Sequence, residues 1–388
     1  QHHAREIICA VCAMRDAVQA KTAVIALKHH YAAQIDALQQ AIAQANADIH
    51  LHLLDSFFPA GDEQTLVFEV TGRVVPPGGL PGLVGCVVSN AATALCVYDA
   101  MQNQPFTHKY LTVTGAVRRP TIVRAPIGTP VADCLSCAGG AEPDEFIVLN
   151  GGPMMGGLIT SLDNPVTKTT GGLLAIPKDH PLLERKSPKL NLQLIMSVCC
   201  QCSMCTQMCP RNALGLNVQP HKAMRSLASG GDLLGEFNGI FSCCNCGLCT
   251  YYACNFGLKP SQVMQTLKSA IASKGVRPRK EVYGPVDGGL ENKKVPVERL
   301  IARLGIAEYD VPAPMAEKPL TTSCVRIALR MGVGAPSVPV VAVGDKVRKN
   351  QLVADIADKK LGVKMHASIS GVVTDISADY IEIRKAAK

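Results

Sequence analysis

Two runs of cysteines in the middle of the chain have the spacing of cluster ligands. The first run, in residues 199–210, has the pattern Cys-x₂-Cys-x₂-Cys-x₃-Cys-Pro, and the second, in residues 243–254, nearly repeats it as Cys-x₂-Cys-x₂-Cys-x₄-Cys. Three thiolates at this step on a short loop can wrap three corners of a cubane iron–sulfur cluster, whereas the fourth lies too far along to close the same cube. The pattern therefore predicts two [4Fe–4S] clusters that exchange their fourth ligands, and a protein that moves single electrons.

We expect each cluster to take three cysteines from one run and one from the other. The first ligand set is predicted to be Cys199, Cys202, Cys205 and Cys254. The second ligand set is predicted to be Cys243, Cys246, Cys249 and Cys209. Cys254 departs from the pattern, because Asn255 follows it whereas Pro210 follows Cys209.

Zinc and disulfide bonds are alternative uses of so many cysteines. A zinc site usually takes two Cys-x₂-Cys pairs, which leaves the third cysteine at the same step and the Cys-Pro dipeptide unexplained. Disulfides need an oxidising compartment, and no secretory segment is visible at the start of the chain. The iron–sulfur interpretation accounts for more of the spacing than either alternative.

The composition indicates a multidomain protein without a signature of nucleic-acid binding. The 388 residues predict roughly two to four domains, and 47% hydrophobic residues suffice for buried cores. The net charge of +8 is dispersed in short basic groups without interleaved aromatic residues, so no nucleic acid is expected as a partner. No run reaches the roughly 18–20 apolar residues of a membrane span. Seventeen cysteines without a signal peptide favour the reducing cytoplasm.

Residues 1–105 are predicted to form an α/β domain. Ala23–Leu27 and Ile49–Leu54 are predicted as strands on either side of a helix over Tyr31–Ala45, whose apolar residues recur at helical spacing. Val84–Val88 is predicted as a further buried strand. Strand–helix units of this kind build a Rossmann-like parallel sheet with ligands at the carboxyl ends of its strands.

Four further segments follow this domain. Residues 106–185 combine a hairpin, a helix and a strand, which suggests a small β-grasp domain, and residues 190–270 are predicted as a ferredoxin-like α-helical domain with two clusters. Residues 275–320 are predicted as a linker with one short helix, Val297–Leu304. Residues 321–388 alternate short strands and turns, which suits a C-terminal β sandwich like biotinyl or lipoyl domains.

Several motifs resemble the family that includes the C subunit of the Rnf electron-transport complex and the flavin-binding subunit of respiratory complex I. Phe58-Pro59-Ala60-Gly61-Asp62-Glu63 is similar to its acidic flavin loop, and Asn90-Ala91-Ala92-Thr93 is similar to its flavin-contacting Asn-x-x-Thr segment. Residues 112–120 with Gly128-Thr129-Pro130 resemble its soluble-ligand-binding β-grasp domain (SLBB), and residues 151–156 resemble a signature of the Rnf subunit. The resemblance covers nearly the whole chain.

The domain order resembles one branch of this family. The sandwich-like segment comes last, as in the cobalamin reductases of propanediol-utilisation microcompartments, whereas the Rnf subunit carries it first. The resemblance implies NADH as electron donor, FMN, two [4Fe–4S] clusters and a cobalamin as acceptor. It also implies a corrinoid adenosyltransferase and microcompartment proteins as partners, in the cytoplasm and inside a bacterial microcompartment. The alternatives are the electron-input subunit of an Rnf-like NADH:ferredoxin oxidoreductase complex, and a cluster-bearing scaffold with a degenerate flavin site.

The resemblance implies a flavin site but names no catalytic residue. Its cofactor-binding residues are expected to be Phe58, Gly61, Asp62, Glu63, Asn90 and Thr93. Asp62 and Glu63 would contact a nicotinamide ribose or ordered water, and Asn90 and Thr93 the ribityl chain or phosphate. The glycine-rich nucleotide loop of the family is missing from the sequence, which does not begin with Met, so we expect that loop to precede residue 1.

Overall fold

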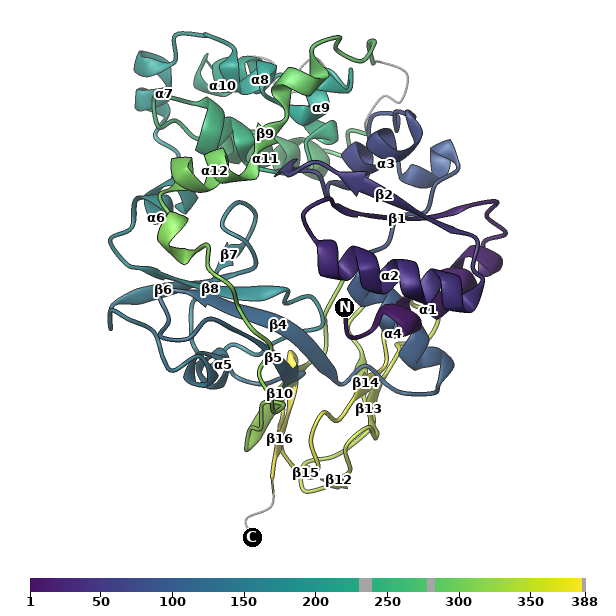
Figure 1. The fold of residues 1–388 in the computed structure, drawn as a ribbon. Helices are drawn as coiled ribbons and strands as arrows, with labels where there is room; N and C mark the ends of the chain where they lie inside the picture. The colour runs from purple at the N-terminus through teal and green to yellow at the C-terminus, as the bar shows by residue number, and fades with distance from the viewer. Residues whose placement is uncertain (230–238, 278–282, 386–388) are drawn as a thin grey trace. The chain divides into compact units, whose positions relative to one another are not determined.

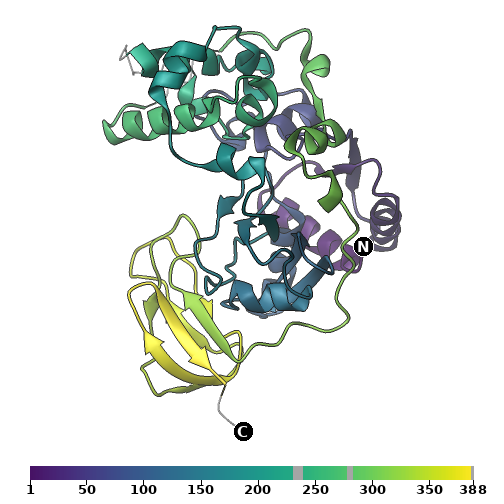
Figure 2. The same ribbon diagram turned by 90° about the vertical axis from the view of Figure 1, so that its left-hand side faces the viewer.

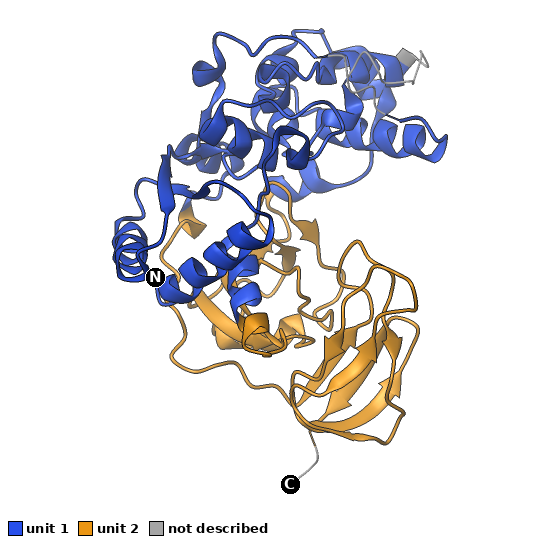
Figure 3. Cartoon of the chain, turned by 90° about the vertical axis from the view of Figure 1, so that its right-hand side faces the viewer, with its two compact units in different colours: residues 1–98, 181–307 blue, residues 99–180, 308–388 orange. Residues whose placement is uncertain are grey.

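The computed structural model describes residues 1–229, 239–277 and 283–385. The chain divides into two compact units, each assembled from two separate segments (Figure 3). Unit 1 comprises residues 1–98 and 181–307, and unit 2 comprises residues 99–180 and 308–388. The N-terminal α/β segment and the cysteine-rich segment therefore belong to one unit, although unit 2 interrupts them in the sequence.

The N-terminal part of unit 1 is built around two parallel strands joined by a crossover helix (Figure 1). Its first elements are α1 (Ala4–Ala17), β1 (Ala23–Lys28), α2 (Ala32–Ala45) and β2 (Ile49–Leu54). The two strands pair in register from Ala23 opposite Ile49 to Lys28 opposite Leu54. The predicted strands and helix are therefore present in this segment. Further along lie β3 (Phe57–Phe58), α3 (Glu63–Thr71), the 3₁₀ turn η1 (Pro81–Val84) and α4 (Ala91–Met101).

The strand predicted at residues 84–88 is wrong. Val84 ends η1, and the following residues have no regular secondary structure. Gly85 turns the chain with a φ of 72°, and Val87 is 70% exposed. The apolar residues of this segment led to the prediction of a buried strand, but several of their side chains are exposed to solvent.

The cysteine-rich part of unit 1 consists of short helices around one core. They are α6 (Pro181–Lys186), α7 (Leu192–Val198), α8 (Met204–Gln207), α9 (Pro210–Ala213), α10 (Pro220–Ser229) and α11 (Pro260–Ser273). Between α10 and α11 lie the 3₁₀ turn η3 (Ile240–Ser242) and the π-helical turn η4 (Cys249–Ala253). Leu216, Met224, Val263 and Met264 are almost fully buried in the shared core. The loops that carry the cysteines leave from this core.

Part of the segment predicted as a linker completes unit 1. The short strand β9 (Val295–Pro296) pairs antiparallel with β3 of the N-terminal segment, and α12 (Val297–Leu304) follows it directly. Leu300 and Leu304 bury one face of α12, which packs against β3, β9 and η4. This segment therefore joins the α/β part to the cysteine-rich part.

Unit 2 begins with a mixed five-stranded sheet in the order β5-β4-β8-β6-β7. Its strands are β4 (His108–Gly115), β5 (Thr121–Pro126), β6 (Phe146–Asn150), β7 (Gly157–Leu158) and β8 (Gly172–Pro177). The helix α5 (Val131–Cys137) shares the core of this sheet. Gly115 has a φ of 93°, and a Cβ there would lie 2.0 Å from the carbonyl oxygen of Ala175, so only glycine allows β4 and β8 this close approach.

The C-terminal segment folds as two facing antiparallel sheets, seen in yellow and green in Figure 2. The four-stranded sheet contains β10 (Cys324–Ala328), β16 (Tyr380–Arg384), β15 (Gly371–Ile376) and β12 (Lys346–Val347). The three-stranded sheet contains β11 (Val338–Pro339), β13 (Leu352–Asp355) and β14 (Met365–His366). Val325, Val353, Val373 and Ile383 are fully buried between them.

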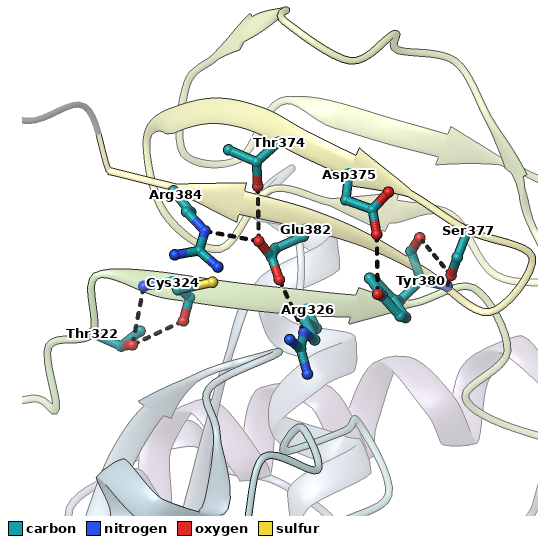
Figure 4. Close-up of polar contacts among 9 residues, drawn as sticks. All are labelled: Thr322, Cys324, Arg326, Thr374, Asp375, Ser377, Tyr380, Glu382 and Arg384. Carbon is teal, nitrogen blue, oxygen red and sulfur yellow. Dashed lines mark hydrogen bonds and ion pairs between the residues drawn. The ribbon is translucent and has the colours of Figure 1, made fainter.

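A polar network fixes three strands of the larger sheet to one another (Figure 4). Glu382 accepts hydrogen bonds from Arg326 Nε at 3.0 Å, Arg384 Nε at 2.8 Å and Thr374 Oγ1 at 2.9 Å. Burial opposes ionisation of Glu382, but the three donors outweigh it and lower its pKa to about 2. A satisfied carboxylate is thereby held on β16 between β10 and β15.

Candidate iron–sulfur and flavin site

The two cysteine loops share one backbone conformation. Cys199 follows the end of α7, and Cys243 follows η3. Two residues beyond them, Gln201 and Asn245 have φ values of 58° and 56°. A left-handed residue at the same place in both loops turns the chain between the first cysteine and the next. The repeat in the sequence is therefore also a repeat in the structure.

The structure gathers the first thiol set, Cys199, Cys202, Cys205 and Cys254. Burial raises the pKa of Cys205, and the charges of the other three thiolates raise it further, to about 12. Charge effects of this kind act over short distances, so Cys254, Cys199 and Cys202 lie near Cys205. Cys202 is exposed and the other three are half-buried, so this set lies close to the surface.

The extra residue before Cys254 is wound into η4. A π-helical turn holds one more residue than an α-helical turn and is frequent at functional sites. The equivalent stretch of the first run, between Cys205 and Cys209, contains α8 instead. Cys254 directly follows η4 and has an extended backbone, with φ −82° and ψ 109°. It comes near Cys205 in spite of the longer spacing.

The second thiol set, Cys209, Cys243, Cys246 and Cys249, lines one cavity together with Cys244. Cys209 is 9% exposed, and Cys246 and Cys249 are each 8% exposed. Burial raises the pKa of Cys249, and the charges of Cys243 and Cys209 raise it further. The structure thus brings Cys209 of the first run to three cysteines of the second run, inside the protein.

Both thiol sets suit a [4Fe–4S] cluster by the chemistry of their donors. Burial and the charges of neighbouring thiolates raise the pKa of Cys205 in the first set and of Cys209 and Cys249 in the second set. Iron relieves the repulsion between these charges when it replaces the protons. All 17 cysteines are free of disulfide bonds. No three His, Cys, Asp or Glu side chains among the described residues come together as ligands of one metal ion, but a four-iron cube holds its thiolates farther apart than one ion does.

Hydrogen bonds to the sulfur atoms differ between the two sets. Gln201 donates from its side-chain Nε2 to Cys199 Sγ at 3.3 Å and to the carbonyl oxygen of His221 at 3.2 Å. Asn245 donates to Cys243 Sγ from its backbone nitrogen at 3.4 Å. The same position of the loop therefore supplies a side-chain donor in one set and a backbone donor in the other.

A buried ion pair connects the predicted flavin loop to the second thiol set. Arg211, two residues after Cys209, donates from Nη2 to Asp62 Oδ1 at 2.7 Å, and the two side chains are 6% and 10% exposed. Asp62 is also the N-cap of α3, because its Oδ2 accepts hydrogen bonds from the backbone nitrogen and the hydroxyl of Thr65. Both carboxylate oxygens of Asp62 are therefore engaged within the protein. Arg211 was not predicted as a functional residue, and its position directly after the Cys209-Pro210 dipeptide is the one feature of the sequence that points to it.

The other residues of the predicted flavin site lie in two places. Phe58 is half-buried on β3, and Gly61 and Glu63 are exposed at the start of α3. A Cβ at Gly61 would meet no atom within 4 Å, so the space beside this loop is open to a ligand. Asn90 Oδ1 accepts from the backbone nitrogen of Thr93 at 2.8 Å and from its hydroxyl at 3.1 Å, at the start of α4. Figure 1 shows α3 and α4 on opposite sides of β1 and β2. The residues predicted to bind the flavin therefore do not form one cluster.

Four domain families match successive parts of the chain. They are the Nuo51 FMN-binding domain in residues 1–99, the SLBB domain in residues 110–157, the 4Fe-4S dicluster domain in residues 198–259 and the RnfC barrel sandwich hybrid domain in residues 312–387. The chain is thus a multidomain α/β protein with an FMN-binding part and an iron–sulfur part. Each helix in the part of the chain that the structure describes is too short or too polar to span a bilayer.

Two curated relatives are similar over nearly the whole chain. "Cobalamin reductase PduS" of Salmonella typhimurium (strain LT2) is 41% identical over 374 residues, which are 95% of this chain and 81% of the relative. "Cobalamin reductase PduS" of Citrobacter freundii is 39% identical over the same shares of both chains. Among solved structures, an NAD⁺-reducing [NiFe]-hydrogenase in its H₂-reduced state matches with a TM-score of 0.42 and 17% identity, over 71% of this chain and 53% of that chain.

Proposed function

The chain belongs to the family of the PduS cobalamin reductases, and from this premise we propose that it is an oxidoreductase that transfers electrons from NADH, through FMN and two [4Fe–4S] clusters, to a cobalamin. The observation that carries the proposal is the pair of four-thiol sets in the same unit as the FMN-binding segment. A flavin, when bound, supplies the conversion between a two-electron hydride donor and one-electron acceptors.

The positions of the cysteines and of the flavin loop indicate which residues would hold the two clusters and the flavin. Cys199, Cys202, Cys205 and Cys254 would hold the first cluster. Cys209, Cys243, Cys246 and Cys249 would hold the second cluster. The open loop with Phe58, Gly61 and Glu63 would face the flavin, whereas Asp62 serves the protein as the cap of α3 and the partner of Arg211.

We further propose the finer assignments that the resemblance implies. The N-terminal segment would be a Rossmann-like flavin domain completed by a glycine-rich loop, residues 106–185 a β-grasp domain, residues 190–270 a ferredoxin-like two-cluster domain and the last segment a biotinyl- or lipoyl-like sandwich. The protein would work in the cytoplasm, inside a bacterial microcompartment, beside a corrinoid adenosyltransferase. Co-purification of the protein with microcompartment shell proteins would support this location.

Anaerobic purification and reconstitution test the proposed function. We expect about eight iron atoms per chain, as two cubane clusters require, together with stoichiometric FMN. NADH should then change the visible absorbance of hydroxocobalamin at a rate that depends on the amount of protein. A holoprotein that contains both clusters and FMN, and reduces an artificial dye with NADH but leaves cobalamin unchanged, would contradict the cobalamin assignment.

The electron-input subunit of an Rnf-like complex is the second candidate. The match of residues 312–387 to the RnfC barrel sandwich hybrid domain favours it. The full-length relatives favour the first candidate, because both carry the name cobalamin reductase. Reduction of a ferredoxin in preference to cobalamin by the same preparation would decide for the second.

A further inference from the structure

An open cavity lies beside the first thiol set. Its volume is about 600 Å³, within the range of sites for small organic ligands. One wall comes from the cysteine-rich segment and contains Met204, Met208 and Tyr252. The other wall comes from β9 and α12. Both walls belong to unit 1.

The charged groups of this cavity are all cationic. Lys294, Arg299 and Arg303 line it, and its lining among the described residues includes no Asp or Glu. Lys294 is already neutralised by Glu69 and Glu291, each at 2.9 Å. Arg303 donates to Asn255 Oδ1 at 3.0 Å, and Arg299 forms no ion pair in the part of the chain that the structure describes. Two uncompensated guanidinium groups one turn apart on α12 repel each other, and an anion between them removes that repulsion.

The remainder of the lining is apolar and adaptable. Met204 and Met208 present flexible thioethers, and Tyr252 presents a ring. Val295 and Pro296 of β9 continue the apolar surface toward the arginines. A ligand that matches both parts has a flat or bulky apolar body and a phosphate group. Guanidinium groups favour phosphate because they can bind two of its oxygens at once.

The cavity adjoins ligands of the first set through the chain itself. Met204 precedes Cys205, and Ala253 and Asn255, which flank Cys254, also line the cavity. A ligand bound there would lie next to the more exposed of the two thiol sets. We propose that this cavity, with Arg299 and Arg303 as its anion-binding groups, is the binding site of a phosphate-bearing redox ligand.

This inference rests on the proposed function for the identity of that ligand. Two molecules in the proposed reaction combine a phosphate with a large ring system: FMN, which carries a phosphate monoester, and cobalamin, which carries a phosphodiester. Each has a counterpart without phosphate, riboflavin and cobinamide respectively. Riboflavin lacks only the phosphate, whereas cobinamide lacks the phosphate together with the ribose and the benzimidazole. The flavin pair therefore tests recognition of the phosphate, and the corrinoid pair tests recognition of the whole nucleotide loop.

The test compares two charge-reversed variants with the unmodified protein. The corrinoids are titrated into the holoprotein, and the flavins are titrated into cluster-loaded protein from which FMN has been removed. Arg299→Glu reverses a charge in the cavity, and Arg330→Glu, at an exposed arginine of the C-terminal sandwich, is the matched control. Dissociation constants are measured for all four compounds, and iron content and unfolding temperature verify that each variant is folded. We expect Arg299→Glu to weaken binding of FMN or cobalamin by about tenfold or more, as loss of a charge-assisted hydrogen bond predicts, and to change binding of its phosphate-free counterpart by less than about twofold.

The pattern of losses identifies the source of the phosphate. An effect on cobalamin but not cobinamide assigns the cavity to the corrinoid, and an effect on FMN but not riboflavin assigns it to the flavin. Equal behaviour of Arg299→Glu and Arg330→Glu toward all four compounds would overturn the proposal, as would equal weakening of phosphate-bearing and phosphate-free ligands. If the unmodified holoprotein reduces cobalamin with NADH while the cavity variant binds normally, this inference fails and the proposed function stands.

Discussion

The two thiol sets have the same loop conformation but opposite surroundings. The second set lines a cavity inside the helical core, where three of its four cysteines are at most 9% exposed. The first set contains an exposed cysteine and three half-buried ones, and it adjoins an open basic cavity. Solvent exposure and hydrogen bonds to sulfur are two of the factors that set the potential of an iron–sulfur cluster. One repeated motif thus provides an insulated site and an accessible site.

The connections of the two sets to the rest of unit 1 differ as well. The second set is tied to the N-terminal segment by the ion pair between Arg211 and Asp62. The first set is bordered by η4 and α12, which leave the cavity open. We infer that the second set is the more firmly held of the two and that the first set is the one next to which an external ligand can bind. The predictions that follow test this difference.

The largest effect is expected from removing one exchanged ligand from each set. Cys209→Ser should lower the iron content from about eight to about four atoms and lower the unfolding temperature, because Cys209 is buried in the core. Cys254→Ser should remove a similar amount of iron with a smaller loss of stability. Iron analysis, electron paramagnetic resonance and thermal unfolding measure these changes. Loss of the accessible cluster in Cys209→Ser would refute the exchange of ligands between the runs.

A chelator or mild oxidant should distinguish the two clusters by rate. We expect the first set, with exposed Cys202, to release about four iron atoms in a fast phase, and the buried second set to release the remainder slowly. The decay of cluster absorbance in anaerobic chelator gives the two phases. Cys254→Ser is the matched control, because it should lose the fast phase and keep the slow phase. A single phase in the unmodified protein would show that exposure does not separate the sets.

Arg211→Met should destabilise unit 1 by about 3 kcal/mol. The substitution keeps much of the side-chain volume but leaves Asp62 buried without its partner, and breaking buried ion pairs has costs of that order. Arg118→Met is the control, since Arg118 and Glu142 form a pair at 2.6 Å whose side chains are 62% and 60% exposed, and it should change stability by less than about 1 kcal/mol. Urea unfolding followed by cluster absorbance reports on Arg211, and unfolding followed by circular dichroism on Arg118. Similar small changes in both would mean that Arg211 does not anchor the second set.

The two thiol sets could be predicted from the sequence because the spacing of the cysteines is confined to two short segments. The spacing of Cys199, Cys202 and Cys205 is a property of one short loop, and the repeat gives it twice. The pairing of Arg211 with Asp62 could not be predicted, because it joins residues 149 positions apart. The π-helical turn before Cys254 was equally hidden, since a count of residues does not reveal how they are wound.

The fold shows the same division between local and distant information. Helical periodicity located α2 correctly, because the apolar face of a helix recurs every three or four residues. The short helix predicted at Val297–Leu304 is present as α12. Pairing of β9 with β3 depends on residues more than two hundred positions away, so the segment around Val295 resembled a linker. The opposite error occurred at residues 84–88, where a strand was predicted although the segment enters no sheet and Val87 is exposed.

The smallest effect tests the hydrogen bonds to sulfur, which come from a side chain in one loop and from the backbone in the other. Gln201 and Asn245 both have positive φ, so glycine fits either position without backbone strain. Gln201→Gly removes the side-chain donor to Cys199, whereas Asn245→Gly keeps the backbone donor to Cys243. A hydrogen bond to sulfur favours the more negative, reduced cluster, and a bond worth about 1 kcal/mol corresponds to roughly 40 mV for one electron. The potential of the first cluster should therefore fall by roughly 40 mV in Gln201→Gly, while the second stays unchanged in Asn245→Gly, as measured by redox titration with paramagnetic resonance. Equal shifts in both variants would show that the loss of a side chain, rather than of the donor, controls the potential.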